Sequence, residues 1–207
     1  MQKLIVIGAG GHGRVVADAA RVAGIELCAF VDRKPPATMI EGLPVYASLE
    51  EASDALGVEA SQLSFIVAIG DNCQRAEEYA RAREQGFVPL SVIHPTAAIS
   101  ETAHISAGAY VGAQAVINPG AQIGEDSIIN TAAVIEHDCR VGSHSFVAPG
   151  AVLCGAARIG NYTLVGTNAT LIPLVSVGAQ ALVAAGAVVV DSHPDNVRLF
   201  GVPAQEA

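Results

Sequence analysis

The chain has 207 residues, a formal net charge of −9 and a pI near 5.0. Nucleic acids and anionic membranes are bound by clustered Lys and Arg, so this charge balance argues against both as partners. Hydrophobic residues make up 51% of the chain but aromatic residues only 4%, which favours a thin, regular core of small and β-branched side chains.

The first ninety residues alternate between short apolar runs and amphipathic stretches. We expect strands at 3–8, 27–32 and 65–69, and helices at 14–23, 48–56 and 72–85. This alternation predicts a small, Rossmann-like α/β domain over residues 1–90. The apolar start lacks a signal-peptide cleavage site, and the four cysteines form no C-x-x-C pair. We therefore expect a cytoplasmic protein with reduced thiols.

A glycine-rich loop follows the first expected strand. Gly8-Ala9-Gly10-Gly11-His12-Gly13 matches G-x-G-x-x-G, and Asp32 stands at the end of the second strand. Backbone N–H groups at the start of a helix bind phosphate. NAD requires two mononucleotide-binding halves, and ninety residues supply about one. The motif therefore favours a single nucleotide diphosphate, such as a nucleotide-sugar, with a purely structural turn as the alternative.

A six-residue repeat follows, and residues 89–92 lead directly into it. From Ile93 to Val189 every sixth residue is Ile, Val or Leu, and the residue two before it is nearly always small. Six residues make one short strand and one turn, and three such strands close a triangular coil. An α-helix would scatter this period around its circumference. The repeat predicts a left-handed parallel β-helix over residues 91–190.

Two other segments need an interpretation. Residues 162–190 carry no charge and are long enough to cross a membrane, but the repeat runs through them, so we expect no membrane insertion. Residues 191–207 leave the repeat and contain Asp191, Pro194 and Asp195. We expect this tail to cap the β-helix, with one last strand near 198–202.

One histidine stands out. His137 lies two residues after Ile135, on the outward side of a coil, between Glu136 and Asp138. We interpret it as a general base whose protonated form the Asp138 carboxylate stabilises, with a solvated surface histidine as the alternative. The other histidines share no phase at the 18-residue coil spacing, so we expect no metal site.

The chain resembles the bacterial nucleotide-aminosugar N-acetyltransferases, which are grouped with the sialic-acid O-acetyltransferases. The resemblance covers the whole chain. It rests on residues 10–13, Val31-Asp32, 68–72, Asn130-Thr131, 136–139, 148–150, 168–170 and 201–204.

The resemblance implies a homotrimer with active sites between adjacent β-helices, acetyl-CoA as donor, and a UDP- or GDP-linked 4-amino-6-deoxy sugar as acceptor. It implies His137 as the base, with Asp138 beside it and Gly155 offering a backbone N–H to the acetyl oxygen. It places Thr167 and Ala185 at the acetyl-CoA site. It places these residues at the nucleotide-sugar site: Gly11, His12, Gly13, Asp32 and Gly70.

The chain departs from the family pattern at three places. Phe146 stands where many members carry a second histidine, and His144 is displaced by two residues. Gln205 follows Pro203-Ala204, where a basic residue is common. Arg33 follows Asp32 in place of an acid. We therefore include Phe146 and Arg33 among the expected substrate-binding residues and expect the acceptor to differ.

The sequence thus predicts an acetyl-CoA-dependent N-acetyltransferase that acts on a nucleotide-sugar. O-acetylation of sialic acid or another sugar is an alternative in the same fold. A non-catalytic trimeric β-helix scaffold is an alternative of a different class.

Overall fold

The computed structural model describes residues 3–35 and 37–206. Met1, Gln2 and Ala207, which belong to the first and last expected segments, lie outside the described residues. The chain divides into two compact units, Met1–Pro95 and Thr96–Ala207.

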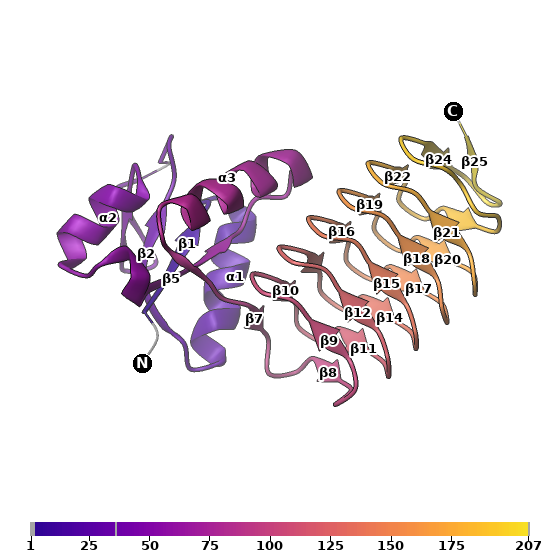
Figure 1. Ribbon diagram of the computed structural model, residues 1–207, viewed down its shortest axis with the longest axis horizontal. Helices are drawn as coiled ribbons and strands as arrows, with labels where there is room; N and C mark the ends of the chain where they lie inside the picture. Colours follow the sequence, from indigo (N-terminus) through magenta and orange to yellow (C-terminus); the bar gives the residue numbers. More distant parts are fainter. Residues whose placement is uncertain (1–2, 36, 207) are drawn as a thin grey trace. The chain divides into compact units, whose positions relative to one another are not determined.

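The first unit is an α/β domain, as the alternating pattern predicts (Figure 1). Its six-stranded sheet has the order β3-β4-β2-β1-β5-β6, in which all neighbours are parallel except β3 and β4. The strands are β1 (Lys3–Ile7), β2 (Glu26–Val31), β3 (Met39–Ile40), β4 (Leu43–Tyr46), β5 (Leu63–Val67) and β6 (Val88–Pro89). The helices are α1 (Gly11–Val22), α2 (Leu49–Leu56) and α3 (Asn72–Glu84), with a 3₁₀ turn, η1, at Ala60–Gln62. The short strand β7 (Val92–Ile93) closes the unit.

The sheet buries both of its faces, because successive strand residues point to opposite sides. On one face Ile5, Ile7 and Phe65 pack with residues of α2 and α3, among them Ala52 and Tyr79. On the other face lie Leu4, Val6 and Phe30, beneath α1. The carboxyl ends of β1, β2 and β5 meet at one edge, where parallel sheets place their ligand sites.

The second unit is a left-handed parallel β-helix in which the coils stack as repeated rungs (Figure 1). Strands pair with the strand one coil on, as Val116 does with Val134 and Val134 with Val152. The first sheet contains β10 (Tyr110–Val111), β13 (Ile128–Ile129), β16 (Phe146–Val147), β19 (Leu164–Val165), β22 (Leu182–Val183), β24 (Arg198–Phe200) and β25 (Gln205–Glu206). The second contains β8 (Ala98–Ile99), β11 (Val116–Ile117), β14 (Val134–Ile135), β17 (Val152–Leu153), β20 (Thr170–Leu171) and β23 (Val188–Val189). The third contains β9 (His104–Ile105), β12 (Gln122–Ile123), β15 (Arg140–Val141), β18 (Arg158–Ile159) and β21 (Ser176–Val177).

The second residue of each strand fills the axis of the coil and the first points outward. Val147, Leu153 and Val165 are fully buried, and so are small corner residues such as Ser145 and Ala151. Each buried aliphatic side chain contributes about 1.5–3 kcal/mol.

The corners carry a backbone feature that the repeat pattern did not reveal. Every sixth residue from Gly108 to Gly186 has a positive φ, between 53° and 75°. Most of these residues are not glycine, and among them are Asp138, His144 and Leu174. The left-handed conformation turns the chain sharply between two strands of the coil.

The glycines that follow the large aliphatic residues serve close stacking of the coils. A Cβ at Gly160 would lie 2.4 Å from the backbone nitrogen of Ala179, one coil on. At Gly142 the corresponding distance to the nitrogen of Asn161 is also 2.4 Å. Only glycine allows neighbouring coils to approach this closely.

The tail forms one more, shortened coil. Val177 pairs with His193 and Leu182 pairs with Arg198, both 16 residues on, where complete coils have a spacing of 18. The expected last strand is present as β24, and β25 adds an antiparallel strand beside it. The tail therefore continues the pairing at one end of the β-helix.

Candidate functional site

The glycine loop of the first unit is shaped by two close contacts. A Cβ at Gly13 would lie 2.0 Å from the carbonyl oxygen of Gly8, so α1 packs directly against the loop that precedes it. Gly8 itself has a φ of +105° and faces the carbonyl oxygen of Ala68. In contrast, no atom lies within 4 Å of the Cβ positions of Gly10 and Gly11, the N-cap and first residue of α1. The start of this helix is open to a ligand.

A cavity of about 630 Å³ lies over this helix start. Its lining includes five of the residues expected at the nucleotide-sugar site: Gly11, His12, Asp32, Arg33 and Gly70. Gly13, which the same motif predicts, is buried and is not part of the lining. The close packing of the loop accounts for a glycine at this position, and contact of Gly13 with the nucleotide-sugar stays a prediction.

The Asp32 side chain accepts hydrogen bonds from two backbone segments that border the cavity. Its Oδ2 accepts a hydrogen bond from the N–H of Ala9 at 3.0 Å, and its Oδ1 accepts one from the N–H of Lys34 at 2.9 Å. The carboxylate therefore ties the glycine loop to the segment after β2 at the wall of the cavity.

The helix α3 adds charged residues that the motif analysis missed. Gln74, Glu78 and Arg81 line the cavity from successive turns of this helix. Glu78 pairs with Arg33 at 2.7 Å and with Arg81 at 3.0 Å. Burial raises the pKa of Glu78, and the Arg33 charge opposes this rise. The spacing of polar residues along α3 is the signal that could have identified them.

His12 is uncharged at neutral pH. Burial, and to a smaller extent the positive charge of Arg75, lower the pKa of His12 to about 4. Arg75 is itself fully buried and donates to the carbonyl oxygen of Ile69 and to the side chain of Asn72. The imidazole therefore offers the cavity hydrogen bonds but no charge.

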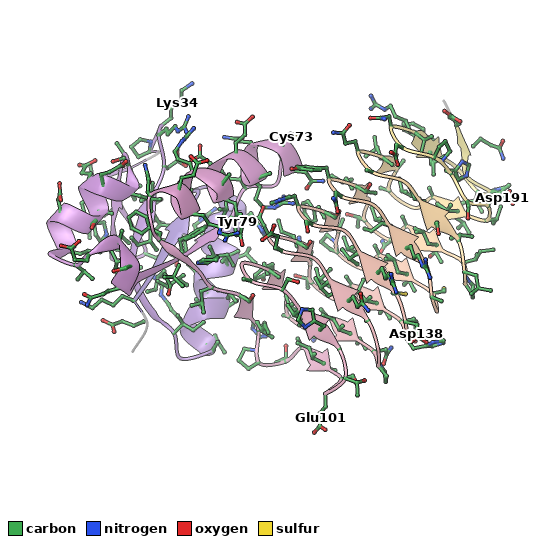
Figure 2. The ribbon with its side chains drawn as sticks, viewed as in Figure 1. Lys34, Cys73, Tyr79, Glu101, Asp138 and Asp191 are labelled. Carbon is green, nitrogen blue, oxygen red and sulfur yellow. The ribbon has the colours of Figure 1, made fainter. Side chains whose placement is uncertain are left out.

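In the second unit, His137 and Asp138 form a pair at one corner of the β-helix. The Nδ1 atom of His137 lies 3.0 Å from Oδ2 of Asp138, and both side chains are exposed. Asp138 adopts the left-handed corner conformation and projects away from the coil (Figure 2). With Nδ1 bound to the carboxylate, Nε2 is the ring nitrogen of His137 that remains for a second partner.

Gly155 lies beside this free ring nitrogen, one coil on. A Cβ at Gly155 would be 2.6 Å from Nε2 of His137, so any side chain there would displace the imidazole. The N–H of Ala156 donates to the carbonyl oxygen of His137 at 2.8 Å, which fixes the two corners together. Within the described residues, the N–H of Gly155 donates to no acceptor. An imidazole nitrogen and a free backbone donor therefore lie side by side.

Two thiols lie near this corner but are not suited to nucleophilic catalysis. Burial raises the pKa of Cys139 to about 11. Burial, followed by the charge of Glu136, also raises the pKa of Cys154, the residue before Gly155. Both thiols are therefore protonated near neutrality, and the thiolate is the nucleophilic form.

The remaining expected residues lie at other corners of the β-helix. Phe146 is half-buried and begins β16, and His144 precedes it with Nδ1 2.8 Å from Oδ2 of the buried Asp126. Thr167 and Ala185 are exposed at a third corner, where the N–H of Gly186 donates to the carbonyl oxygen of Thr167. One chain thus brings His137, Asp138 and Gly155 together. It places Phe146, Thr167 and Ala185 at other corners.

Neither a metal cluster nor a membrane-spanning helix is found among the described residues. No group of three or more His, Cys, Asp or Glu side chains is placed to hold a metal ion in the described part of the chain. Among the described helices, none combines the length and the apolar character that a membrane span requires.

Comparison with known protein families matches both units. Residues 3–82 match the PglD N-terminal domain. Residues 120–155 match the bacterial transferase hexapeptide repeats, and residues 156–190 match the hexapeptide repeat of succinyl-transferase. These matches agree with the α/β domain and with the β-helix.

Solved structures resemble the whole chain. A perosamine N-acetyltransferase variant from Caulobacter crescentus, in complex with CoA and GDP-perosamine, is 36% identical with a TM-score of 0.93, covering 99% of this chain and 96% of that one. The acetyltransferase domain of PglB from Neisseria gonorrhoeae, in complex with acetyl coenzyme A, is 35% identical with a TM-score of 0.92, covering 100% and 99%. WeeI from Acinetobacter baumannii is 25% identical over 100% of both chains, with a TM-score of 0.90.

These relatives combine the same two units along nearly their entire length, as the sequence motifs predict. The chain belongs to the bacterial nucleotide-aminosugar N-acetyltransferase family, the sugar acetyltransferases in which a PglD-type domain precedes a left-handed β-helix of hexapeptide repeats.

Proposed function

We propose that this enzyme transfers the acetyl group of acetyl-CoA to the amino group of a 4-amino-6-deoxy sugar linked to a nucleoside diphosphate, with His137 as general base. The observation that carries the proposal is the arrangement at one corner, where Nδ1 of His137 is bound to Asp138 and Nε2 faces Gly155. The complexes of the Caulobacter crescentus and Neisseria gonorrhoeae relatives with CoA, GDP-perosamine and acetyl coenzyme A support both substrates.

The reaction needs one proton transfer and one group transfer. The amine nitrogen attacks the thioester carbonyl carbon, Nε2 of His137 accepts the amine proton, and the carbon–sulfur bond breaks to release CoA as its thiolate. The imidazolium then returns the proton to the sulfur. Negative charge develops on the acetyl oxygen, and the free N–H of Gly155 is the donor that stabilises it.

Direct transfer is favoured over an acyl-enzyme. A covalent intermediate would need a nucleophile beside the thioester, and burial raises the pKa values of both thiols at this corner, Cys139 and Cys154. Asp138 acts through His137, because its carboxylate holds the ring orientation and stabilises the imidazolium.

The nucleotide occupies the cavity of the first unit in this proposal. The diphosphate lies at the start of α1, over Gly10 and Gly11, where backbone N–H groups and the helix dipole favour an anion. Arg33 adds a positive charge at the cavity, and Gly70 and Asp32 border the same space. His12 contributes hydrogen bonds in its neutral form.

We also propose that the enzyme acts as a homotrimer. Two outer faces of the β-helix are mainly apolar: one presents Phe146, Leu164 and Leu182, and the other presents Val116, Val134, Val152 and Val188. The proposed acetyl-CoA contacts Thr167 and Ala185 stand at a different corner from His137. A neighbouring copy would supply them, together with Phe146 at the acceptor.

Replacement of His137 tests the mechanism. With acetyl-CoA and a panel of UDP- and GDP-linked aminosugars, we expect His137→Ala to lower kcat by about 10²–10⁴-fold, the usual range for loss of a general base. The affinity for acetyl-CoA should stay nearly unchanged. Asp138→Asn should reduce kcat by a smaller factor, because it removes the support of the base and not the base itself.

His104→Ala is the matched control, since His104 is an exposed histidine on β9. It should leave kcat unchanged. A His137→Ala enzyme with near-normal kcat would remove this residue from the mechanism, and a wild-type enzyme that acetylates no nucleotide-linked aminosugar would refute the proposed function.

A further inference from the structure

One outer face of the β-helix carries two adjacent arginines. The sheet of β9, β12, β15, β18 and β21 points its first strand residues outward, and Arg140 of β15 pairs in direct register with Arg158 of β18. Both side chains are exposed. Their neighbours in the same row are Gln122 and Ser176, so the row holds no acid beside them.

Neither guanidinium has a partner within the described residues. No hydrogen bond or ion pair joins Arg140 or Arg158 to a described side chain or carbonyl group. By comparison, Arg21, Arg33 and Arg81 in the first unit each pair with a glutamate. Paired strands are about 4.8 Å apart, and like charges directly opposite each other destabilise a sheet.

Two neighbouring arginines are also unusual in a unit that contains few basic residues. Residues 96–207 contain three Lys or Arg and eight Asp or Glu, and two of the three cations lie side by side. The backbone holds them in place, because the N–H of Arg140 donates to Ala157 and that of Arg158 donates to Val175. Two adjacent guanidinium groups on a fixed backbone, with no acidic partner, form a positively charged patch that is suited to bind an anion.

The patch lies next to the proposed catalytic corner. Arg140 follows His137 by three residues in one coil, and Arg158 follows Gly155 by three residues in the next. Each arginine begins the strand directly after the corner, so its Cα lies at most about 11 Å from that of His137 or Gly155 in its own coil. Both substrates of the proposed reaction carry phosphate groups.

We propose that Arg140 and Arg158 form a phosphate-binding site for a substrate bound at the His137 corner. The inference rests on the proposed function for the identity of that substrate. Each guanidinium presents a planar fork of N–H donors that matches phosphate oxygens, and a phosphate between the two side chains offsets their mutual repulsion. The phosphate belongs either to acetyl-CoA or to the nucleotide of the acceptor.

Calorimetric binding of CoA, pantetheine, GDP and UDP to the full chain tests the site without turnover. We expect Arg140→Gln and Arg158→Gln each to weaken one phosphate-bearing ligand about 10-fold, and the double variant to weaken it about 100-fold. The salt dependence of that affinity should decrease in parallel. Arg140→Lys should retain part of the affinity, since it keeps the charge and loses the fork.

The ligand that weakens identifies the source of the phosphate. Loss of CoA binding with pantetheine binding unchanged assigns it to acetyl-CoA, and loss of GDP or UDP binding assigns it to the acceptor. Arg198→Gln is the control, because Arg198 is exposed on β24 in a different sheet and should leave all four affinities unchanged.

Two binding results would overturn the site: unchanged affinities in the double variant, and a wild-type protein that binds none of the phosphate-bearing ligands. A double variant with a changed assembly mass and intact affinities would also overturn it. That result would show that the arginines pair with an acidic residue of a neighbouring copy. A wild-type protein that binds CoA through these arginines but acetylates no aminosugar would refute the proposed function and leave the site standing.

Discussion

At the scale of single residues, the two kinds of glycine in the loop before α1 have different roles. A Cβ at Gly13 would lie 2.0 Å from the carbonyl oxygen of Gly8, whereas the Cβ position of Gly10 is open. We expect Gly13→Ala to lower the free energy of unfolding of the first unit by about 1–3 kcal/mol or more, the usual cost of overpacking. Gly10→Ala should change it by less than about 0.5 kcal/mol. Thermal unfolding of both variants checks this difference, and equal stability of the two would contradict it.

The buried imidazole of His12 predicts a loss of stability in acid. Its pKa is about 4 in the folded state, whereas an unperturbed histidine has a pKa of 6.5. As the pH falls from 6.5 to 4, the unfolded chain takes up a proton that the folded chain does not, so the free energy of unfolding decreases. Above pH 6.5 both states are neutral and the effect is absent. The full loss is on the order of 3 kcal/mol.

His12→Gln removes this titration. Denaturant unfolding at pH 7 and pH 4.5 should show a drop for the wild type that is about 2 kcal/mol larger than the drop for the variant. The exposed His104→Gln variant should behave like the wild type. Equal drops in all three proteins would show that His12 is protonated as easily in the fold as in the unfolded chain.

Sequence motifs predicted which chemical groups lie together at His137 but not the contacts that join distant loops. The order Glu136-His137-Asp138 predicted the carboxylate beside the imidazole, and the structure gives the contact at 3.0 Å. No local pattern could show that Asp32 bonds Ala9 and Lys34, because those contacts depend on how two loops meet in space. The contact between Glu78 and Arg33 escaped notice for the same reason, since the two residues become neighbours only when α3 packs on the sheet.

At the scale of the elements, the left-handed corners are a store of backbone strain. Leu174 has a φ of 69° and is 76% exposed, so its side chain contributes little packing to offset the conformation. We expect Leu174→Asn to raise the free energy of unfolding of the β-helix by about 0.5–1 kcal/mol, because Asn adopts this conformation more readily. Gly186→Ala is the reverse test at an open corner with the same φ of 69°, and it should destabilise. Melting temperatures that shift in the opposite directions would contradict this account.

The strands of the β-helix could be predicted from the sequence because one six-residue period specifies all of them. A large aliphatic residue at every sixth position fixes strand, turn and coil together, and the strands lie where the period placed them, as at Val134–Ile135 and Val152–Leu153. The corner conformation could not be predicted, since Ala, His, Tyr and Leu occupy positions where glycine or asparagine would be the usual signal. The sequence also did not reveal the 16-residue spacing of the last coil. Asp191 and Pro194 interrupt the six-residue repeat, yet His193 and Arg198 still pair with strands of the coil before.

At the scale of the whole molecule, the three outer faces of the β-helix differ in character. Two are lined by half-buried aliphatic residues such as Val152 and Leu164, and the third presents Gln122 and the two arginines of the proposed phosphate site. A single chain therefore leaves two apolar faces in water, which soluble proteins generally cover by association. Copies of the same chain can cover both faces in a ring that closes by three-fold symmetry.

Charges on the apolar faces should disrupt the assembly. We expect the wild type to have a mass about three times the chain mass of 21.1 kDa in light scattering. Val152→Glu and Leu164→Glu place a carboxylate in the proposed contact and should shift the mass toward the monomer, because burial of an unpaired charge is costly. Gln122→Glu, on the polar face, should keep the mass of the wild type. Acetyl transfer should fall with the loss of the trimer, since His137 and the pair of Thr167 and Ala185 stand at different corners of one chain. A monomeric variant with full activity would show that one chain is sufficient for catalysis.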